Sequence, residues 1–331
     1  WVLLMRMHHA MVDGMESKEI VRYLLSPEPE GEPPVLDTWH PRPELSDATL
    51  VAAAVTDAVR DSIALWQQVL TQGTAALPRM PETLDLSAFN SRLMPINPAA
   101  LNGPVKAGRG FSMAELDLER VKAVRKVLGG SVNDILLSAC AAGFTTVLAD
   151  YLHEQVQGRS MRAMVPVSMH SPDKVGISGH NAIGAMVVEL PLGPMEPTDR
   201  LAHITKQMES FKTLKKAMPA EAINPGSALA SPMTLIMASR MAHTAPVVVN
   251  TVISNVPGPQ TTLYLLGRRL HRMGACISLW TPLKTAISIM SYDGTVTVSV
   301  VTDDATFSIP GALSGAVVAG LEELERAAGL L

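Results

Sequence analysis

Hydrophobic and polar positions along this chain follow two different periods, and the alternation between them predicts helices interleaved with strands. Apolar residues recur at helical spacing over residues 13–25, 47–70, 118–128, 135–148 and 310–328, and after Asp199. Short apolar or β-branched runs predict strands at 1–7, 110–118, 161–167, 183–190, 247–253, 286–291 and 296–301. Asp293-Gly294 predicts a hairpin turn between the last two strands. The fold class that this order predicts is α/β, with packed layers of helix and sheet.

Two stretches interrupt this order and predict connections. Residues 26–46 hold six prolines, which is typical of a solvent-exposed linker. Residues 73–110 are rich in Gly, Pro and Asn and predict an irregular crossover. The helix between them, over 47–72, has Ser46 or Asp47 as its N-cap.

Composition indicates a globular chain with a substantial core. The 331 residues are 47% hydrophobic and 18% charged, which is enough for two domains. The net charge of -4 argues against binding duplex nucleic acid, which favours a basic excess. Cys140 and Cys276 lie in apolar surroundings, so we expect buried thiols in a reducing compartment, with a single disulfide left open.

Targeting and membrane signals are weak in this sequence. We find no signal peptide, and the longest apolar region, around 228–252, is interrupted by Arg240, His243 and Pro246. That region predicts a helix followed by a strand. Any membrane contact is therefore expected to be peripheral.

Candidate chemistry begins at His8-His9-Ala10-Met11-Val12-Asp13-Gly14, which leaves the first predicted strand and enters the first predicted helix. A neutral imidazole accepts a proton from a hydroxyl near neutral pH when its ring is held in one orientation. Asp13 can fix such a turn, and Gly14 permits a backbone conformation that a side chain would block. A packed histidine pair without chemistry is the alternative. No third strong ligand is evident nearby, so we expect no metal.

Three further blocks accompany this motif in order. They are Leu101-Asn102-Gly103-Pro104-Val105 with the helix at 121–128, then Ser131-Val132-Asn133-Asp134, then Ser254-Asn255-Val256-Pro257-Gly258-Pro259. HHxxxDG with these blocks resembles the bacterial wax ester synthase/acyl-CoA:diacylglycerol acyltransferase family. That family is similar to chloramphenicol acetyltransferase and to the condensation domains of peptide synthetases.

The resemblance implies a chloramphenicol-acetyltransferase-like fold of two lobes that meet at a tunnel. Residues 1–110 would be the remainder of the N-terminal acyltransferase domain, and residues 111–331 the C-terminal domain. The chain begins with Trp1 within a predicted strand. We therefore expect it to be truncated at its N-terminus, with the first lobe incomplete.

The resemblance also implies a reaction, the transfer of a fatty acyl group from acyl-CoA to diacylglycerol or to a long-chain alcohol. His9 would act as the general base, with His8 supporting the turn, Asp13 holding its geometry and Gly14 allowing it. Ser254 and Asn255, with Pro257 and Gly258, would border the substrate tunnel and position the alcohol or the acyl carbonyl. Asn133 and Asp134 would have a mainly structural role.

Partners and location follow from the same resemblance. Acyl-CoA is expected as a co-substrate, and no cofactor is expected. The chain would work in the cytoplasm, or peripherally on the inner face of the membrane or on lipid inclusions. Two alternatives stay open: a non-catalytic lipid- or partner-binding fragment, and a condensation-type domain that forms esters or amides.

Overall fold

The computed structural model describes residues 2–7, 17–30, 100–168, 183–217, 248–305 and 310–331, with single positions and short runs between 40 and 63. By its contacts the chain separates into two compact units. The first consists of Trp1–Gly31, Ser87–Phe211 and Val247–Leu331, and the second of Glu32–Leu86 and Lys212–Pro246. The sheet belongs to the first unit, and so do the helices packed on it, apart from residues 212–217.

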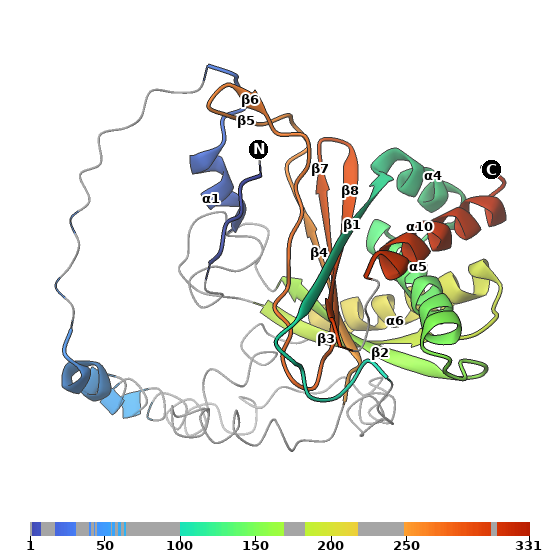
Figure 1. The fold of residues 1–331 in the computed structure, drawn as a ribbon, viewed down its shortest axis with the longest axis horizontal. Helices are drawn as coiled ribbons and strands as arrows, with labels where there is room; N and C mark the ends of the chain where they lie inside the picture. The colour runs from blue at the N-terminus through green and yellow to red at the C-terminus, as the bar shows by residue number, and fades with distance from the viewer. Residues whose placement is uncertain are drawn as a thin grey trace. The chain divides into compact units, whose positions relative to one another are not determined.

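A six-stranded mixed sheet is the centre of this unit (Figure 1). Its strands, in spatial order, are β1 (Arg109–Asp117), β8 (Thr295–Asp303), β7 (Thr285–Tyr292), β4 (Thr251–Pro257), β2 (Ser160–Ser168) and β3 (Ile183–Pro191). β4 runs parallel to β2 and β7, and the other neighbours are antiparallel. The predicted α/β class is therefore confirmed, and β4 lies inside the sheet between two parallel partners.

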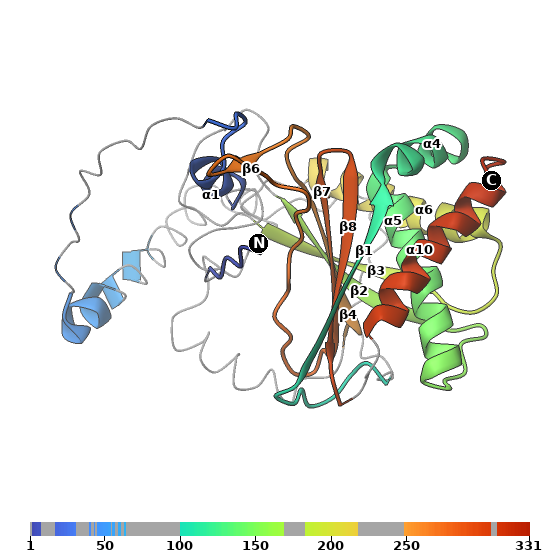
Figure 2. The same cartoon turned by 45° about the horizontal axis from the view of Figure 1, so that its top comes forward.

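Helices cover one face of the sheet, as Figures 1 and 2 show from two directions. They are α4 (Leu118–Leu128), α5 (Val132–Thr146), α6 (Pro197–Ala217) and α10 (Pro310–Ala327). α5 continues into a short π-helical turn, Val147–Tyr151, and nearly all of its side chains are buried. Because α5 is apolar around its whole circumference, it can be stable only in the interior.

Small residues let α5 and α10 approach closely. A side chain at Gly320 of α10 would place its first carbon 2.6 Å from the carbonyl oxygen of Ala139 in α5. The same α5 residues belong to the main hydrophobic core, together with Val317 and Leu321 of α10 and the inward-facing residues of the sheet. The helix layer and the sheet thus share one core.

The edge strand β3 is bound by a side chain of α6. Gln207 accepts a hydrogen bond from the Glu189 N–H at 2.9 Å and donates one to the Glu189 carbonyl at 2.8 Å. Both backbone groups are therefore satisfied where no further described strand pairs with β3. Leu201, Ile204 and Met208 of α6 face the core, as their spacing predicts.

The helix predicted at 118–128 ends where its range predicts, and the predicted hairpin turn forms. α4 ends at Gly129, whose φ of 84° is a left-handed conformation that glycine adopts without strain. Asp293 and Gly294 have φ values of 45° and 79° in the two-residue turn between β7 and β8. These turns depend on local backbone preferences, which is why the sequence predicts them well.

A small substructure lies beside the sheet and connects to the N-terminal part of the chain. Helix α1 (Ser17–Leu24) is followed by Leu25, which is buried with Leu263 and Tyr292. Ser26 forms an isolated antiparallel bridge with Tyr264, in the hairpin of β5 (Tyr264–Leu265) and β6 (Arg268–Arg269). The predicted helix at 13–25 is confirmed over residues 17–24.

Several predicted elements differ from the structure. Residues 2–7, predicted as a strand, have no regular secondary structure and are exposed, because no described strand pairs with them. The strand predicted at 247–253 instead spans Thr251–Pro257, since hydrogen bonding to β7 continues through Asn255 and Val256. The Ser254-Asn255 pair therefore lies within a strand rather than in the turn that follows.

The linker and the second predicted helix are described only in part. Residues 26–30 are bound near β5 through Ser26, so this part of the predicted linker is ordered by the bridge. The described positions between 47 and 63 are helical, and the Thr49 N–H donates to the Ser46 hydroxyl at 3.2 Å, which makes Ser46 the cap. Most other residues of 26–46 and 47–72 lie outside the described residues, and so do residues 73–99 of the predicted crossover.

The prediction that both cysteines are buried is correct for Cys140 and wrong for Cys276. Cys140 is fully buried in α5, whereas Cys276 is exposed, and both are free thiols. Residues 273–279 alternate between half-buried and exposed along an extended segment, and Cys276 takes an exposed position. The apolar neighbours of Cys276 in sequence therefore lie on the opposite side of the backbone.

Among the described residues, one stretch has the length and apolar character of a membrane span. It is Val132–Tyr151, and 72% of it is buried inside the fold. That burial is typical of the core helix of a globular domain.

Candidate active site

The predicted catalytic residues His8, His9, Asp13 and Gly14 lie outside the described residues. The chain that follows them is described from Ser17, where α1 begins. The other predicted site residues, at 133–134 and 254–258, are all described. They lie where the end of β4 meets the start of α5.

Asn133 and Asn255 are brought into contact by this arrangement. The Asn255 side-chain N–H donates to the Asn133 side-chain carbonyl at 3.1 Å, across 122 residues of sequence. Each amide keeps further donors and acceptors, because one hydrogen bond uses only part of its capacity. Both side chains are half-buried, so these remaining groups are open to a ligand.

A cavity of about 280 Å³ adjoins the amide pair. Its polar wall is made by Ser131, Asn133, Asn255, Ser291 and Arg125, and its apolar wall by Leu118, Val132, Leu136, Pro257 and Val296. Apolar walls with a few convergent polar groups are typical of small-molecule sites. Among the described residues, this cavity contains the predicted residues Asn133, Asn255 and Pro257.

Ser254 points away from that cavity. Successive side chains of a strand point to opposite faces of the sheet. Ile253 belongs to the core under the helices, whereas Val252 packs on the other face with Leu283 and Ala286. Asn255 therefore shares the helix-covered face with Ile253, and Ser254 shares the opposite face with Val252. Ser254 and Asn255, which were both predicted to bind substrate, therefore cannot line one wall of a site together.

Asp134 stabilises the start of α5. Its carboxylate accepts the Ser131 N–H at 2.9 Å, and its own N–H donates to the Ser131 hydroxyl at 3.2 Å, which is a capping box. The N-cap is thus Ser131, and Asn133 lies two positions inside the helix. The cap holds the first turn in place, and Asn133 is part of that turn.

Gly258 has a steric role in the same corner. A side chain there would place its first carbon 2.2 Å from the Ser291 carbonyl oxygen. The Gly258 N–H also donates to the Ser291 hydroxyl at 3.3 Å. Only glycine allows the segment after Pro257 to pack this closely on β7, which explains the residue between the two prolines.

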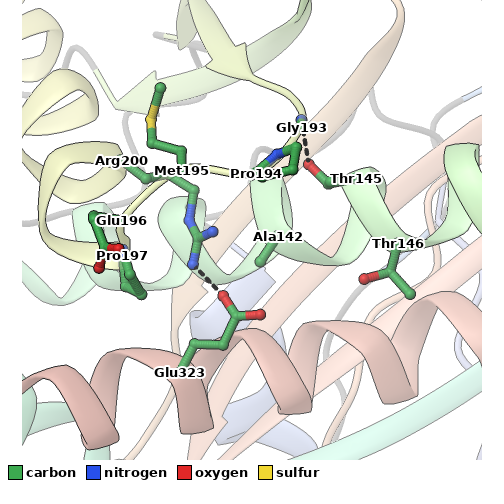
Figure 3. A pocket seen from close by; sticks show the side chains of 10 residues that line it. All are labelled: Ala142, Thr145, Thr146, Gly193, Pro194, Met195, Glu196, Pro197, Arg200 and Glu323. Carbon is green, nitrogen blue, oxygen red and sulfur yellow. Dashed lines mark hydrogen bonds and ion pairs between the residues drawn. The ribbon is translucent and has the colours of Figure 1, made fainter. Parts of the chain in front are cut away.

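A larger cavity, of about 610 Å³, lies near the opposite end of α5 and contains none of the predicted site residues (Figure 3). The buried Arg200 guanidinium lies in it and pairs with Glu323 at 2.7 Å. Arg200 also donates to the hydroxyl of buried Ser138 at 3.3 Å. These contacts join α6 to α5 and α10. The positive charge of Arg200 is balanced by the carboxylate of Glu323.

No group of three or more His, Cys, Asp or Glu residues in the described part of the chain is arranged to hold a metal ion. Sequence reasoning also missed polar residues of the cavity, among them Ser131 and Ser291. A serine three positions before an acidic residue at a helix start is the capping-box signal that identifies Ser131. Ser291 has no comparable signal, because its place depends on the pairing of β7 with β4.

Comparisons with known proteins identify relatives of this chain. Residues 1–136 match the model of the wax ester synthase/diacylglycerol acyltransferase catalytic domain, and residues 179–325 match the C-terminal domain of the same family. A solved wax ester synthase/diacylglycerol acyltransferase from Marinobacter aquaeolei VT8 superposes with a TM-score of 0.63 at 24% identity, covering 98% of this chain and 67% of its own.

The curated relatives include mycobacterial proteins. The probable diacylglycerol O-acyltransferase tgs2 of Mycobacterium tuberculosis H37Rv is 29% identical over 271 residues, which is 80% of this chain and 57% of the relative. A second protein of that strain, also named a diacylglycerol O-acyltransferase, is 28% identical over 343 residues, covering 98% of this chain and 68% of the relative. The chain thus spans 57% of the length of the first relative.

The mixed sheet with helices on one face, and its likeness to the Marinobacter structure, define an α/β protein of the chloramphenicol-acetyltransferase-like fold. The two matched domains follow one another in the family's order. The chain belongs to the wax ester synthase/diacylglycerol acyltransferase family.

Proposed function

We propose that this chain transfers a fatty acyl group from acyl-CoA to the hydroxyl of diacylglycerol or of a long-chain alcohol. One observation carries the proposal. Asn133 belongs to the segment that matches the catalytic domain, Asn255 belongs to the segment that matches the C-terminal domain, and their side chains are hydrogen-bonded beside a cavity. Residues from both matched segments therefore contribute to one site.

His9 is the general base in this proposal. Its neutral imidazole takes the proton of the acceptor hydroxyl as that oxygen attacks the thioester carbonyl, and the imidazolium then protonates the departing thiolate of coenzyme A. The ester C–O bond forms as the C–S bond breaks, so no covalent acyl-enzyme is required. Asp13 and Gly14 shape the turn, and His8 supports it. No cofactor takes part, and acyl-CoA is a substrate.

Asn255 is proposed to position a substrate through the part of its amide that Asn133 leaves unused. An amide offers both a donor and an acceptor, which suits either an ester carbonyl or an alcohol hydroxyl. Ser254 faces the other side of the sheet, so its proposed contact with substrate would lie there. Pro257 lines the cavity, and Gly258 keeps the corner closed against β7.

The test is an acyl-transfer assay with radiolabelled palmitoyl-CoA and either dioleoylglycerol or hexadecanol. We expect wild-type protein to form labelled ester and His9→Ala to lose about 100-fold or more in turnover, the usual contribution of general base catalysis. His203→Ala, which removes an exposed histidine of α6, is the matched control and should stay within about twofold. Equal turnover in wild type and His9→Ala would remove His9 as the base.

Both acceptors are lipids, so we also propose that the protein works peripherally at the cytoplasmic face of a membrane or on lipid inclusions. Flotation with liposomes containing dioleoylglycerol measures this association. Protein that stays in the bottom fraction would contradict it.

A further inference from the structure

The hairpin of β5 and β6 links the C-terminal part of the fold to the helix that follows the HHxxxDG motif. This inference rests on the proposed function, because it concerns how the proposed base is positioned. The hairpin begins at Tyr264, shortly after Pro259, and contacts the end of β7 on one side and the end of α1 on the other. Each connection is made by specific contacts.

Tyr292, the last residue of β7, anchors the hairpin. Its side chain is 2% exposed, and its hydroxyl accepts the Leu263 N–H at 2.8 Å and donates to the Leu270 carbonyl at 3.0 Å. Leu263 comes just before β5 and Leu270 just after β6, so the single Tyr292 hydroxyl binds both ends of the hairpin. Burial raises the pKa of Tyr292, which keeps the hydroxyl protonated and able to donate.

Asp293 provides a second, weaker anchor. Its carboxylate accepts a hydrogen bond from the Thr262 hydroxyl at 2.8 Å. The same carboxylate forms an ion pair with the Arg269 guanidinium at 3.2 Å. The Thr262 hydrogen bond, with help from Arg269, lowers the pKa of Asp293. The β7–β8 turn therefore binds the hairpin through two adjacent residues.

The other side of the hairpin holds the chain just after α1. The Ser26 N–H donates to the Tyr264 carbonyl at 2.9 Å, and the Tyr264 N–H donates to the Ser26 carbonyl at 2.7 Å. Leu25 is buried against Leu263 and Tyr292, and Val21 of α1 packs on the same cluster. The C-terminal end of α1 is thus fixed to the hairpin by backbone pairing and by apolar contact.

We propose that Tyr292 is a positioning residue for the HHxxxDG turn, acting through the hairpin and α1. His9 precedes the first residue of α1 by eight positions in the sequence, and this short separation is the reason for linking the place of α1 to the base. Catalysis is sensitive to such shifts, because a displacement of about 1 Å at a reacting group can cost about 100-fold in rate.

Tyr292→Phe tests the proposal, because it removes only the hydroxyl and keeps the ring in its apolar cluster. We expect kcat to fall about 10- to 100-fold, while KM for palmitoyl-CoA stays within about twofold, since the hydroxyl contacts the hairpin rather than the cavity. We also expect faster hydrogen–deuterium exchange in residues 17–26. Thr262→Val, a milder change at the second anchor, should move both readouts in the same direction by less.

Ser112→Ala is the matched control. Its hydroxyl also makes part-buried hydrogen bonds, to the Pro310 carbonyl at 2.9 Å and the Ser314 hydroxyl at 3.1 Å, but it joins β1 to α10. Unchanged exchange at 17–26 in Tyr292→Phe, or an equal loss of kcat in Ser112→Ala, would overturn the proposal. An inactive wild type would instead count against the proposed function, and the exchange measurement would still decide the coupling.

Discussion

At the scale of single residues, the motif blocks divide into residues that face the cavity and residues that shape the backbone around it. Asn133 and Asn255 meet at the cavity, whereas Asp134 completes a helix cap and Gly258 leaves room for the Ser291 carbonyl. The sequence motifs alone do not separate these two roles, because both kinds of residue occur side by side in the same blocks.

The two cysteines provide a prediction at this scale. Burial raises the pKa of the Cys140 thiol to about 12, so at pH 8 its thiolate fraction is about one in ten thousand and no reagent reaches it. Cys276 is exposed, although partial burial raises its pKa as well. We expect iodoacetamide at pH 8 to modify Cys276 alone, as read by mass spectrometry.

The control for this labelling is Cys276→Ser, which should take up no label until the chain is unfolded in urea. Because the Cys276 pKa is raised, its labelling rate should increase from pH 8 to pH 9. Rapid modification of Cys140 in the folded protein would show that α5 is not a core helix.

At the scale of elements, the start of α5 decides where Asn133 lies. The capping box between Ser131 and Asp134 satisfies two N–H groups that a helix start otherwise leaves unpaired. The preceding helix ends at Gly129 only two residues earlier, so α4 and α5 meet at a short connection. The position of this connection, and hence of the cavity wall, depends on local hydrogen bonds.

We therefore predict that Ser131→Ala destabilises the protein by about 0.5–2 kcal/mol, the usual effect of losing an N-cap. The free energy of unfolding in urea measures this. Ser131→Thr, which keeps the hydroxyl, should retain most of the stability. An Ala variant as stable as the Thr variant would mean that the cap contributes nothing.

At the scale of the whole described fold, the Leu101-Asn102-Gly103-Pro104 block joins the crossover to the sheet. The Asn250 side chain donates to the side-chain carbonyl oxygen of Asn102 at 2.7 Å, and the Asn102 side chain donates to the backbone carbonyl of Val249 at 3.2 Å. Asn250 in turn accepts the Arg162 N–H of β2 at 2.8 Å. These contacts join the block at 101–104 to the residues just before β4 and to the beginning of β2. The predicted domain boundary at 110–111 stays a prediction.

Asn102→Ala should cost about 1–3 kcal/mol, because it leaves the buried Asn250 amide without its acceptor. Urea unfolding measures the loss, and hydrogen exchange should increase first in residues 100–106. Ser210→Ala, which removes an exposed hydroxyl on α6, serves as the control and should change stability by less than about 0.5 kcal/mol. Exchange that increases equally across the sheet would contradict a local role.

The sequence alone determined the elements whose signals are local. The helix at 118–128 that ends at Gly129, the hairpin at Asp293-Gly294 and the apolar helix α5 all agree with prediction, because periodicity and backbone preference act within a few residues. The family was also readable from the sequence, because its blocks are specific and ordered.

Tertiary structure alone decided which of these residues meet. The Asn133–Asn255 hydrogen bond spans 122 positions. Ser254 and Asn255 point in opposite directions because β4 pairs with β7 through both residues, which places them within a strand. The exposure of Cys276 and the Tyr292 anchor likewise depend on which segments lie against the sheet. Strand register and long-range packing arise from contacts between distant segments, so the local pattern that predicts each segment does not contain them.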